Sequence, residues 1–190
     1  MIRTFRPVPV APDVLEDIMA SVLHAPSAGF SQGNEFLVLT SPEALADFWR
    51  LNEHPDFPTP DDHAAARPPV VVIALANSDA YTERYAAPDK IQFGLDQAAN
   101  WPVPYWDVDA GMATMLILLS VVEHGLGAFF AGLFEAGVRT LEHFGVPAHF
   151  RPIGFVGLGH PADVDIASEG SSAFKLRRRP VMEIVHFEHW

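Results

Sequence analysis

The chain has 190 residues and a formal net charge of −12, with 49% hydrophobic and 19% charged residues and no cysteine. That length suits a single domain, residues 1–190, with a sizeable buried core, and the composition excludes a disordered chain. The negative charge argues against binding to nucleic acid phosphates, and the lack of cysteine excludes disulfides and thiolate metal sites.

The first part of the chain predicts helices and strands in alternation. Apolar residues recur at helical spacing over residues 12–23. A strand is expected at residues 35–40, and the next helix begins with Ser41 as its cap and Pro42 at its first position. Residues 69–76 form an apolar run rich in β-branched side chains, which is typical of a strand buried on both faces.

The middle of the chain is less regular. Residues 53–68 are acidic and rich in proline, which indicates a surface loop. A short helix is expected at residues 78–86, with Ser78 or Asp79 as its cap. Residues 86–106 follow as a long irregular segment, and such a loop in a compact domain often serves as a lid. Its aromatic residues near the end are Trp101, Tyr105 and Trp106.

A long core helix is expected at residues 107–124, because this segment is apolar nearly all round. Its longest apolar run, residues 110–122, is shorter than the roughly 20 residues that a bilayer requires. The opening residues MIRTFRPVPV lack the apolar core of a signal peptide. We therefore expect no membrane contact and a cytoplasmic location.

The last third of the chain predicts two more strands. One lies in GLGAFFAGLF, residues 125–134, and the other at residues 152–160, with a helix at about residues 135–144 between them. A few strands among several helices predict an α+β fold, a three-layer sandwich with a small mixed or antiparallel sheet flanked by helices. The tail, residues 180–190, is apolar enough that we expect it to pack on a partner subunit.

Half of the twelve basic residues lie near the two chain ends. In an acidic protein this pattern indicates that the ends meet and hold a small anion such as a phosphate, because the guanidinium group is a planar, bidentate donor. A solvated, frayed terminus is the alternative. The residues concerned are Arg3, Arg6, Lys175, Arg177, Arg178 and Arg179.

The segment HAPSAGFSQGNEF, residues 24–36, is crowded with small residues and uncharged hydrogen-bonding groups. Neutral amides and hydroxyls suit the edge of an uncharged ring, since charges would be costly to desolvate there. We therefore predict that this turn wraps a ring-shaped ligand. The alternative is a polar turn that only links a helix to a strand.

Several other motifs are missing. GLGAFFAG lacks the spacing of a dinucleotide-binding GxGxxG loop, so a Rossmann fold is not expected. The nine histidines show no metal-binding spacing, so no metal site is expected. A hydrolase is not expected either, because no GxSxG motif is present.

Five blocks of the chain together resemble the nitroreductase family, in that family's order. They are RTFRPVPVAPDVLEDIM, APSAGFSQGNEFLVLT, PYWDVDAGMATMLILLSVVEHGLGAFFAGLF, IGFVGLGHP and RRRPVMEIVH. The resemblance implies a domain-swapped homodimer with two FMN sites at its interface. It also implies hydride transfer from NADH or NADPH to the flavin and then to a second acceptor.

The resemblance also implies the residues of the flavin site. The phosphate would be held by Arg3, Arg178 and Arg179. The ring and the ribityl chain would be contacted by Pro26, Ser27, Gln32 and Asn34, while Phe30 stands where the family usually has Asn. The backbone of Ala131, Gly132 and Leu133 would lie near the reactive nitrogen of the flavin. Apart from the resemblance, Trp101, Tyr105 and Trp106 are interpreted either as an aromatic wall over the flavin that selects a flat acceptor or as packing at an interface.

The function implied is that of an FMN-dependent NAD(P)H oxidoreductase, which reduces nitroaromatic, quinone or similar flat acceptors by ping-pong hydride transfer. No side chain is predicted to act as an acid or base, because the flavin carries the chemistry. Two alternatives remain open. APSAGF also resembles flavin-fragmenting enzymes of the 5,6-dimethylbenzimidazole synthase type, and the protein could instead store or sequester flavin without catalysis.

Overall fold

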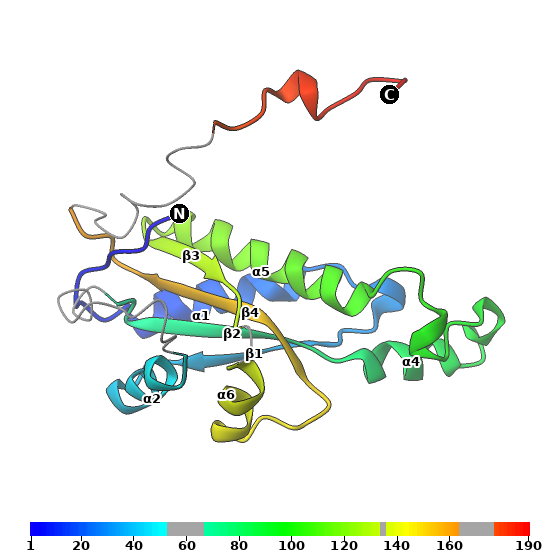
Figure 1. The fold of residues 1–190 in the computed structure, drawn as a ribbon, viewed down its shortest axis with the longest axis horizontal. Helices are drawn as coiled ribbons and strands as arrows, with labels where there is room; N and C mark the ends of the chain where they lie inside the picture. Colours follow the sequence, from blue (N-terminus) through cyan, green and yellow to red (C-terminus); the bar gives the residue numbers. More distant parts are fainter. Residues whose placement is uncertain (53–66, 134–135, 164–176) are drawn as a thin grey trace.

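The fold is built on a four-stranded antiparallel sheet (Figure 1). The computed structural model describes residues 1–52, 67–133, 136–163 and 177–190. The strands are β1 (Asn34–Leu39), β2 (Val70–Ala76), β3 (Gly127–Ala131) and β4 (Arg151–Gly159), in the order β1-β2-β4-β3. The two edge strands are therefore β1 and β3, which confirms the expected small sheet in its antiparallel form.

The centre of the sheet is closely packed. Every residue of β2 is buried, as its β-branched sequence predicts. On the neighbouring strand, Gly157 lies opposite both Val71 and Phe129. A Cβ atom on Gly157 would stand 2.6 Å from the Phe129 ring, so only glycine lets this ring lie across the strand.

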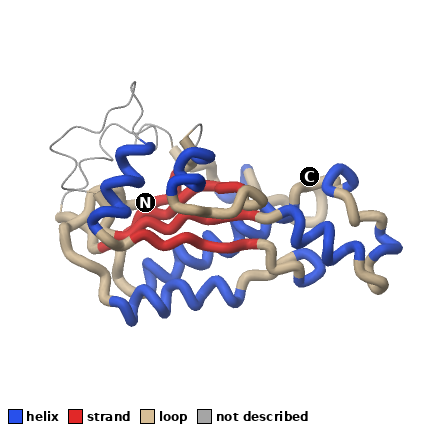
Figure 2. Tube along the Cα trace, turned by 90° about the horizontal axis from the view of Figure 1, so that it is seen from below, coloured by secondary structure: helices blue, strands red, loops and turns tan. Residues whose placement is uncertain are grey.

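Helices cover both faces of the sheet, which makes three layers (Figure 2). On one face lie α1 (Pro12–Ala20) and α5 (Tyr105–Glu123), and on the other lie α2 (Pro42–Asn52) and α6 (Gly137–His143). Each face has its own core. The first includes Ile18, Val72, Ile117, Val121 and Val156, and the second includes Phe48, Ile73, Phe129, Leu141 and Phe155.

Shorter helices fill the connections. The segment before β1 contains the 3₁₀ turns η1 (Ser21–His24) and η2 (Ala28–Phe30). After β2, α4 (Ser78–Ala86) leads into a segment with the turns η3 (Ile91–Phe93) and η4 (Ala98–Asn100). The tail contains one further turn, η6 (Val181–Glu183).

The element boundaries depart from expectation in a few places. The cap of α4 is Asn77, whose side chain accepts a hydrogen bond from the backbone N–H of Asp79, so the expected cap at Ser78 or Asp79 is wrong. The long helix begins at Tyr105, two residues earlier than expected. Most of the expected loop at residues 53–68, and the start of the helix expected at residue 135, lie outside the described residues.

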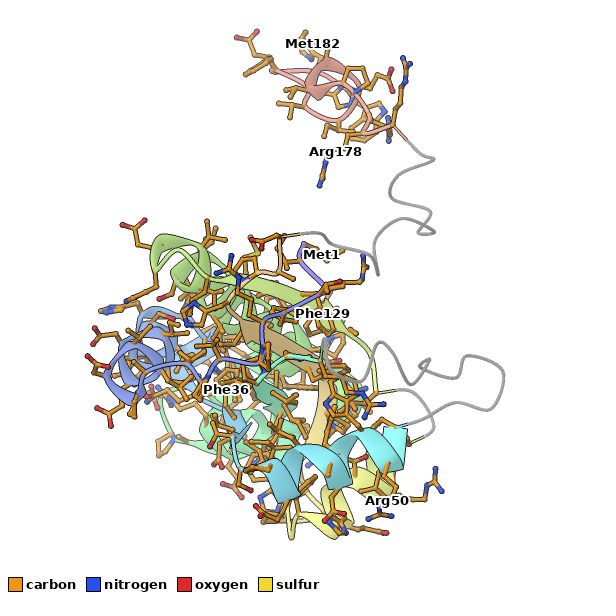
Figure 3. The ribbon with its side chains drawn as sticks, turned by 90° about the vertical axis from the view of Figure 1, so that its left-hand side faces the viewer. Met1, Phe36, Arg50, Phe129, Arg178 and Met182 are labelled. Atoms are coloured by element: carbon orange, nitrogen blue, oxygen red, sulfur yellow. The ribbon has the colours of Figure 1, made fainter. Side chains whose placement is uncertain are left out.

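The N-terminal segment lies beside β3 and the end of β4. The N–H of Ile2 donates to the carbonyl of Ala128, and the N–H of Arg6 donates to that of His160. Residues 177–190 behave differently, because they are all exposed and stand apart from the layered body (Figures 1 and 3). The N-terminal segment is thus hydrogen-bonded to the body, whereas residues 177–190 are exposed.

Helix α5 is long and apolar enough, by length and composition, to be a candidate membrane span. One side of it is buried, through residues that include Ala113, Ile117 and Val121. The other side exposes an apolar stripe spaced alternately by four and three residues, so that its members share one helix face. This α5 stripe consists of Val108, Met112, Met115, Leu119 and Val122.

Candidate functional site

A buried carboxyl group holds the polar loop between η1 and β1 in place. Asp109 lies in the first part of α5 and is 1% exposed. Its Oδ2 atom accepts a hydrogen bond of 2.8 Å from the backbone N–H of Ala28 and another of 2.8 Å from the hydroxyl of Tyr81. One carboxyl group therefore ties the core helix, α4 and the loop together.

Tyr81 is fully buried in this network. Burial raises the pKa of its phenol well above the usual value, and the hydrogen bond to Asp109 raises this pKa further. The hydroxyl consequently stays protonated and can donate to Asp109 at neutral pH. A buried polar pair of this kind is costly to break, because either partner alone would lose its hydrogen bond.

A second clamp comes from α4. The Nε–H of Arg84 donates to the carbonyl of Gly29 at 3.0 Å, while its two terminal nitrogens bind both carboxylate oxygens of Asp89 at 2.9 and 2.7 Å. This hydrogen bonding lowers the pKa of Asp89. The bidentate pair fixes the orientation of the guanidinium group and so directs its Nε–H at the loop.

Two glycines let the loop lie directly against the aromatic rings of α4. A Cβ atom on Gly29 would stand 2.7 Å from the Tyr85 ring, and one on Gly33 would stand 2.5 Å from the Tyr81 ring. The carbonyl of Gly33 also accepts a hydrogen bond from the N–H of Asn77. Any larger side chain at either position would push the loop away from α4.

Four of the predicted flavin contacts lie in this clamped loop or directly after it. Ser27 is half-buried, and its hydroxyl oxygen accepts a hydrogen bond from the N–H of Gln32. The side chains of Pro26 and Gln32 are exposed, and Asn34 begins β1 at the edge of the sheet. The loop thus presents neutral polar groups next to an edge strand.

The other predicted contacts lie at the opposite edge. Ala131 ends β3, with Gly132 and Leu133 after it. Leu133 is 5% exposed and its side chain packs in the core, so only its backbone could face a ligand. Arg3, which is half-buried, belongs to the N-terminal segment that runs beside β3.

The predicted flavin contacts described so far therefore form two groups, one at each edge of the sheet. The loop before β1 forms one group, and Arg3 with the segment after β3 forms the other. Because neighbouring strands lie about 4.8 Å apart, the two edges of a four-stranded sheet are separated by roughly 14 Å. In one chain the two groups therefore lie at opposite edges of the sheet.

The basic residues of the tail also stay apart from the loop. Arg178 and Arg179 are exposed, and Figure 3 shows Arg178 projecting from the tail, outside the body. Arg179 contacts Glu183 of the tail itself, donating to its carbonyl at 2.6 Å. Lys175 lies outside the described residues.

The predicted aromatic wall packs mainly against α4. Trp101 is only 9% exposed, its ring centroid lies 4.8 Å from that of Tyr85, and its indole N–H donates to the carbonyl of Leu95. Trp106 is half-buried against Tyr81. Tyr105 remains 40% exposed, so this residue offers the most surface of the three to a ligand.

A cavity of about 460 Å³ lies at the other end of β1, away from the clamped loop. It includes Pro7, Thr40, Trp49 and Val70 in its lining, and none of the predicted flavin contacts. In the part of the chain that the structure describes, no three His, Asp or Glu residues are grouped so as to hold a metal ion.

Several solved structures share this fold at low sequence identity to this chain. A nitroreductase family protein from Streptococcus pneumoniae superimposes with a TM-score of 0.72 at 20% identity, covering 98% of this chain and 94% of its own. An FMN-dependent nitroreductase from Clostridium difficile gives 0.68 at 18% identity, covering 100% and 94%. An NADPH:FMN oxidoreductase from Vibrio harveyi, in complex with NAD⁺, gives 0.68 at 19% identity, covering 100% and 73%.

These likenesses show that the chain shares its fold with those proteins. The Nitroreductase family model matches residues 1–160, which is most of the chain. The protein therefore belongs to the nitroreductase family, as its five sequence blocks predict.

Sequence reasoning missed the residues that hold the loop, namely Asp109, Tyr81 and Arg84. A signal was present for Asp109, which is the one charged residue within residues 108–122 of an otherwise apolar helix. A buried carboxyl group in such a helix needs hydrogen-bond donors. Which donors those are depends on tertiary contacts 28 and 81 residues away in sequence.

Proposed function

We propose that the protein is an FMN-dependent NAD(P)H oxidoreductase that reduces nitroaromatic, quinone or similar flat acceptors by ping-pong hydride transfer. The observation that carries this proposal is the loop before β1, which Asp109 and Arg84 hold rigidly at the sheet edge. Its neutral polar groups suit the uncharged ring of a flavin, whose phosphate would need a cation elsewhere.

The residues present suit FMN in their chemistry, with neutral polar groups for the ring and arginines for the phosphate. Pro26, Ser27, Gln32 and Asn34 would contact the ring and the ribityl chain, and Arg3 with Arg178 and Arg179 would hold the phosphate. The backbone of Ala131, Gly132 and Leu133 would donate a hydrogen bond to the ring and favour the negative charge of its reduced form. When bound, FMN supplies the hydride exchange.

Such a site needs two chains, so we propose a homodimer. The two groups of flavin contacts lie on opposite edges of one sheet, so a partner chain would bring its own copy of one group to the other group. The exposed α5 stripe offers an apolar surface for this contact. The tail exposes further apolar residues, among them Met182, Phe187 and Trp190, which would pack on the partner.

The acceptor would lie over the flavin beside the aromatic segment that ends at α5. Tyr105 is the exposed member of the predicted wall of Trp101, Tyr105 and Trp106, and would contact a flat acceptor directly. Trp101 would act through packing, because it is buried against Tyr85. We further propose a cytoplasmic enzyme that has no contact with nucleic acid or membranes.

The direct test is an absorbance spectrum of the purified protein, followed by anaerobic titration with NADH and with NADPH. We expect flavin absorbance, a higher melting temperature with added FMN, and bleaching by at least one nicotinamide. A protein without flavin absorbance that FMN does not stabilise would contradict the proposal. Bound FMN that neither nicotinamide reduces would favour storage, and fragmentation of reduced FMN in air would favour the benzimidazole-forming reaction.

The phosphate contact can be tested separately by comparing FMN with riboflavin, which lacks the phosphate. Arg3→Gln should weaken FMN binding about tenfold or more, because charge-assisted hydrogen bonds are the stronger kind. Riboflavin binding should not change. Arg139→Gln, at an exposed position on α6, is the matched control and should affect neither ligand.

A further inference from the structure

The backbone of the clamped loop is strained at a bulky residue. Gly29, Phe30 and Gln32 have positive φ angles of 62°, 58° and 51°. Glycine adopts this left-handed region freely, whereas a phenylalanine there is an outlier because its Cβ crowds the following carbonyl oxygen. The strain at Phe30 therefore calls for an explanation.

Packing of the Phe30 side chain within the chain does not explain the strain. The side chain of Phe30 is 74% exposed, so the strained backbone brings little apolar burial in return. A glycine or an asparagine would tolerate the same φ angle at lower cost. The exposed ring thus has a conformational cost that the folded chain by itself does not recover.

The surrounding hydrogen bonds explain how this conformation persists. On one side of Phe30, the loop is fixed by Asp109 at the N–H of Ala28 and by Arg84 at the carbonyl of Gly29. On the other side, the N–H of Gln32 donates to the hydroxyl of Ser27. Strained residues that are over-determined in this way are concentrated at functional sites.

The position of Phe30 suggests a functional reason for the strained conformation. Phe30 lies between Ser27 and Gln32, which we propose as flavin contacts, and its own N–H donates to the carbonyl of Ser27. The loop therefore fixes an aromatic ring in the open beside a site for flat aromatic molecules. Aromatic rings gain free energy by packing on one another in offset or edge-to-face geometry.

We infer that Phe30 is a specificity-determining residue, whose ring packs against a flat aromatic ring system bound at this site. That ring system is either the flavin or the acceptor. The inference rests on the proposed function and adds to it a side chain that selects the ligand. It also explains why a residue that strains the loop stands at an exposed position.

The experiment uses the full-length protein and three variants of Phe30. Phe30→Asn and Phe30→Gly remove the ring and relieve the strain, whereas Phe30→Tyr keeps the ring. Val138→Asn, which removes an apolar side chain that is 66% exposed on α6, is the control for general loss of apolar surface. The readouts are the melting temperature, the dissociation constant of FMN, and KM and kcat for a quinone and a nitroaromatic acceptor.

We expect the melting temperatures of Phe30→Asn and Phe30→Gly to be unchanged or raised by up to about 3 °C. In the same variants, either the dissociation constant of FMN or the KM of the acceptor should increase roughly 2- to 10-fold. This is the change expected from the loss of one aromatic contact. An increase in the FMN dissociation constant identifies the flavin as the contacted ring, and an increase in acceptor KM at saturating FMN identifies the acceptor. Phe30→Tyr should retain wild-type values.

Three negative results are possible, and they have different meanings. In the first, the wild-type protein binds FMN and turns over, but the FMN dissociation constant and the acceptor KM of Phe30→Asn match those of Val138→Asn. The inference about Phe30 is then wrong and the proposed function stands. If the wild-type protein binds no flavin, the proposed function fails and the inference fails with it. A fall in melting temperature of several degrees in both ring-deleting variants would also overturn the inference, because the ring would then stabilise the fold.

Discussion

At the scale of single residues, the hydrogen bond from Tyr81 to Asp109 has the clearest energetic consequence. Tyr81→Phe removes the donor while leaving the buried carboxyl group in place, so the free energy of unfolding should fall by about 1–3 kcal/mol. Urea denaturation at neutral pH measures this loss. Tyr105→Phe, at an exposed tyrosine, is the control and should stay within about 0.5 kcal/mol of wild type.

The same tyrosine predicts a loss of stability in alkali. Its pKa in the folded protein is raised above the usual value near 10, so its contribution is fully present below pH 10 or so and is lost as the pH rises further. Wild type should therefore lose stability more steeply than Tyr81→Phe above about pH 10. Parallel curves for the two proteins in that range would contradict the buried phenol.

Residue types alone indicated the character of the loop but not what holds it. The crowding of Ser27, Gln32 and Asn34 with two glycines predicted a turn that presents neutral polar groups, and the structure contains such a turn. The left-handed conformation of Phe30 could not be predicted, because local preference disfavours it. Only the contacts from α4 and α5, formed after folding, impose it.

At the scale of secondary structure, Ser41 should determine how well α2 begins. Its hydroxyl oxygen accepts a hydrogen bond from the N–H of Ala44, and Pro42 occupies the first helical position, as the sequence predicts. Ser41→Ala should cost about 1 kcal/mol of unfolding free energy, whereas Ser41→Asp should keep most of it. Equal losses in the two variants, measured by urea denaturation, would show that the loss does not come from the capping hydrogen bond.

Most elements could be predicted from periodicity and capping residues, but their ends could not always be. The strands at residues 34–39, 70–76 and 151–159 lie within a residue of expectation, because each is a short apolar run bounded by turn residues such as Gly, Pro and Asn. The cap of α4 was misplaced by one or two residues, since Asn77, Ser78 and Asp79 are all good caps. The contact that selects Asn77 also involves its N–H, which donates to the carbonyl of Gly33.

At the scale of the whole molecule, the α5 stripe is expected to form the dimer contact. Leu119, which is 54% exposed in that stripe, would become buried against the partner. Leu119→Glu should therefore yield a monomer by sedimentation and lose bound flavin, because burying an unpaired charge is costly. Val138→Glu, on the exposed side of α6, should remain dimeric, and a dimeric Leu119→Glu protein would contradict this interface.

The three-layer fold followed from the sequence, while the arrangement of the site did not. A few strands among several helices predicted helices on both faces of a small sheet. Arg3 and Ser27 are near each other in sequence, and nothing local indicates that they lie at opposite edges of that sheet. The strand order β1-β2-β4-β3 decides this, and it depends on long-range pairing.

The separation of these edges has a consequence for how the proposed enzyme would respond to dilution. Each subunit would lend its loop to one catalytic centre and its β3 edge to the other, and would complete neither by itself. Dissociated chains would then be inert rather than half as fast, so specific activity would decline together with the fraction of paired subunits.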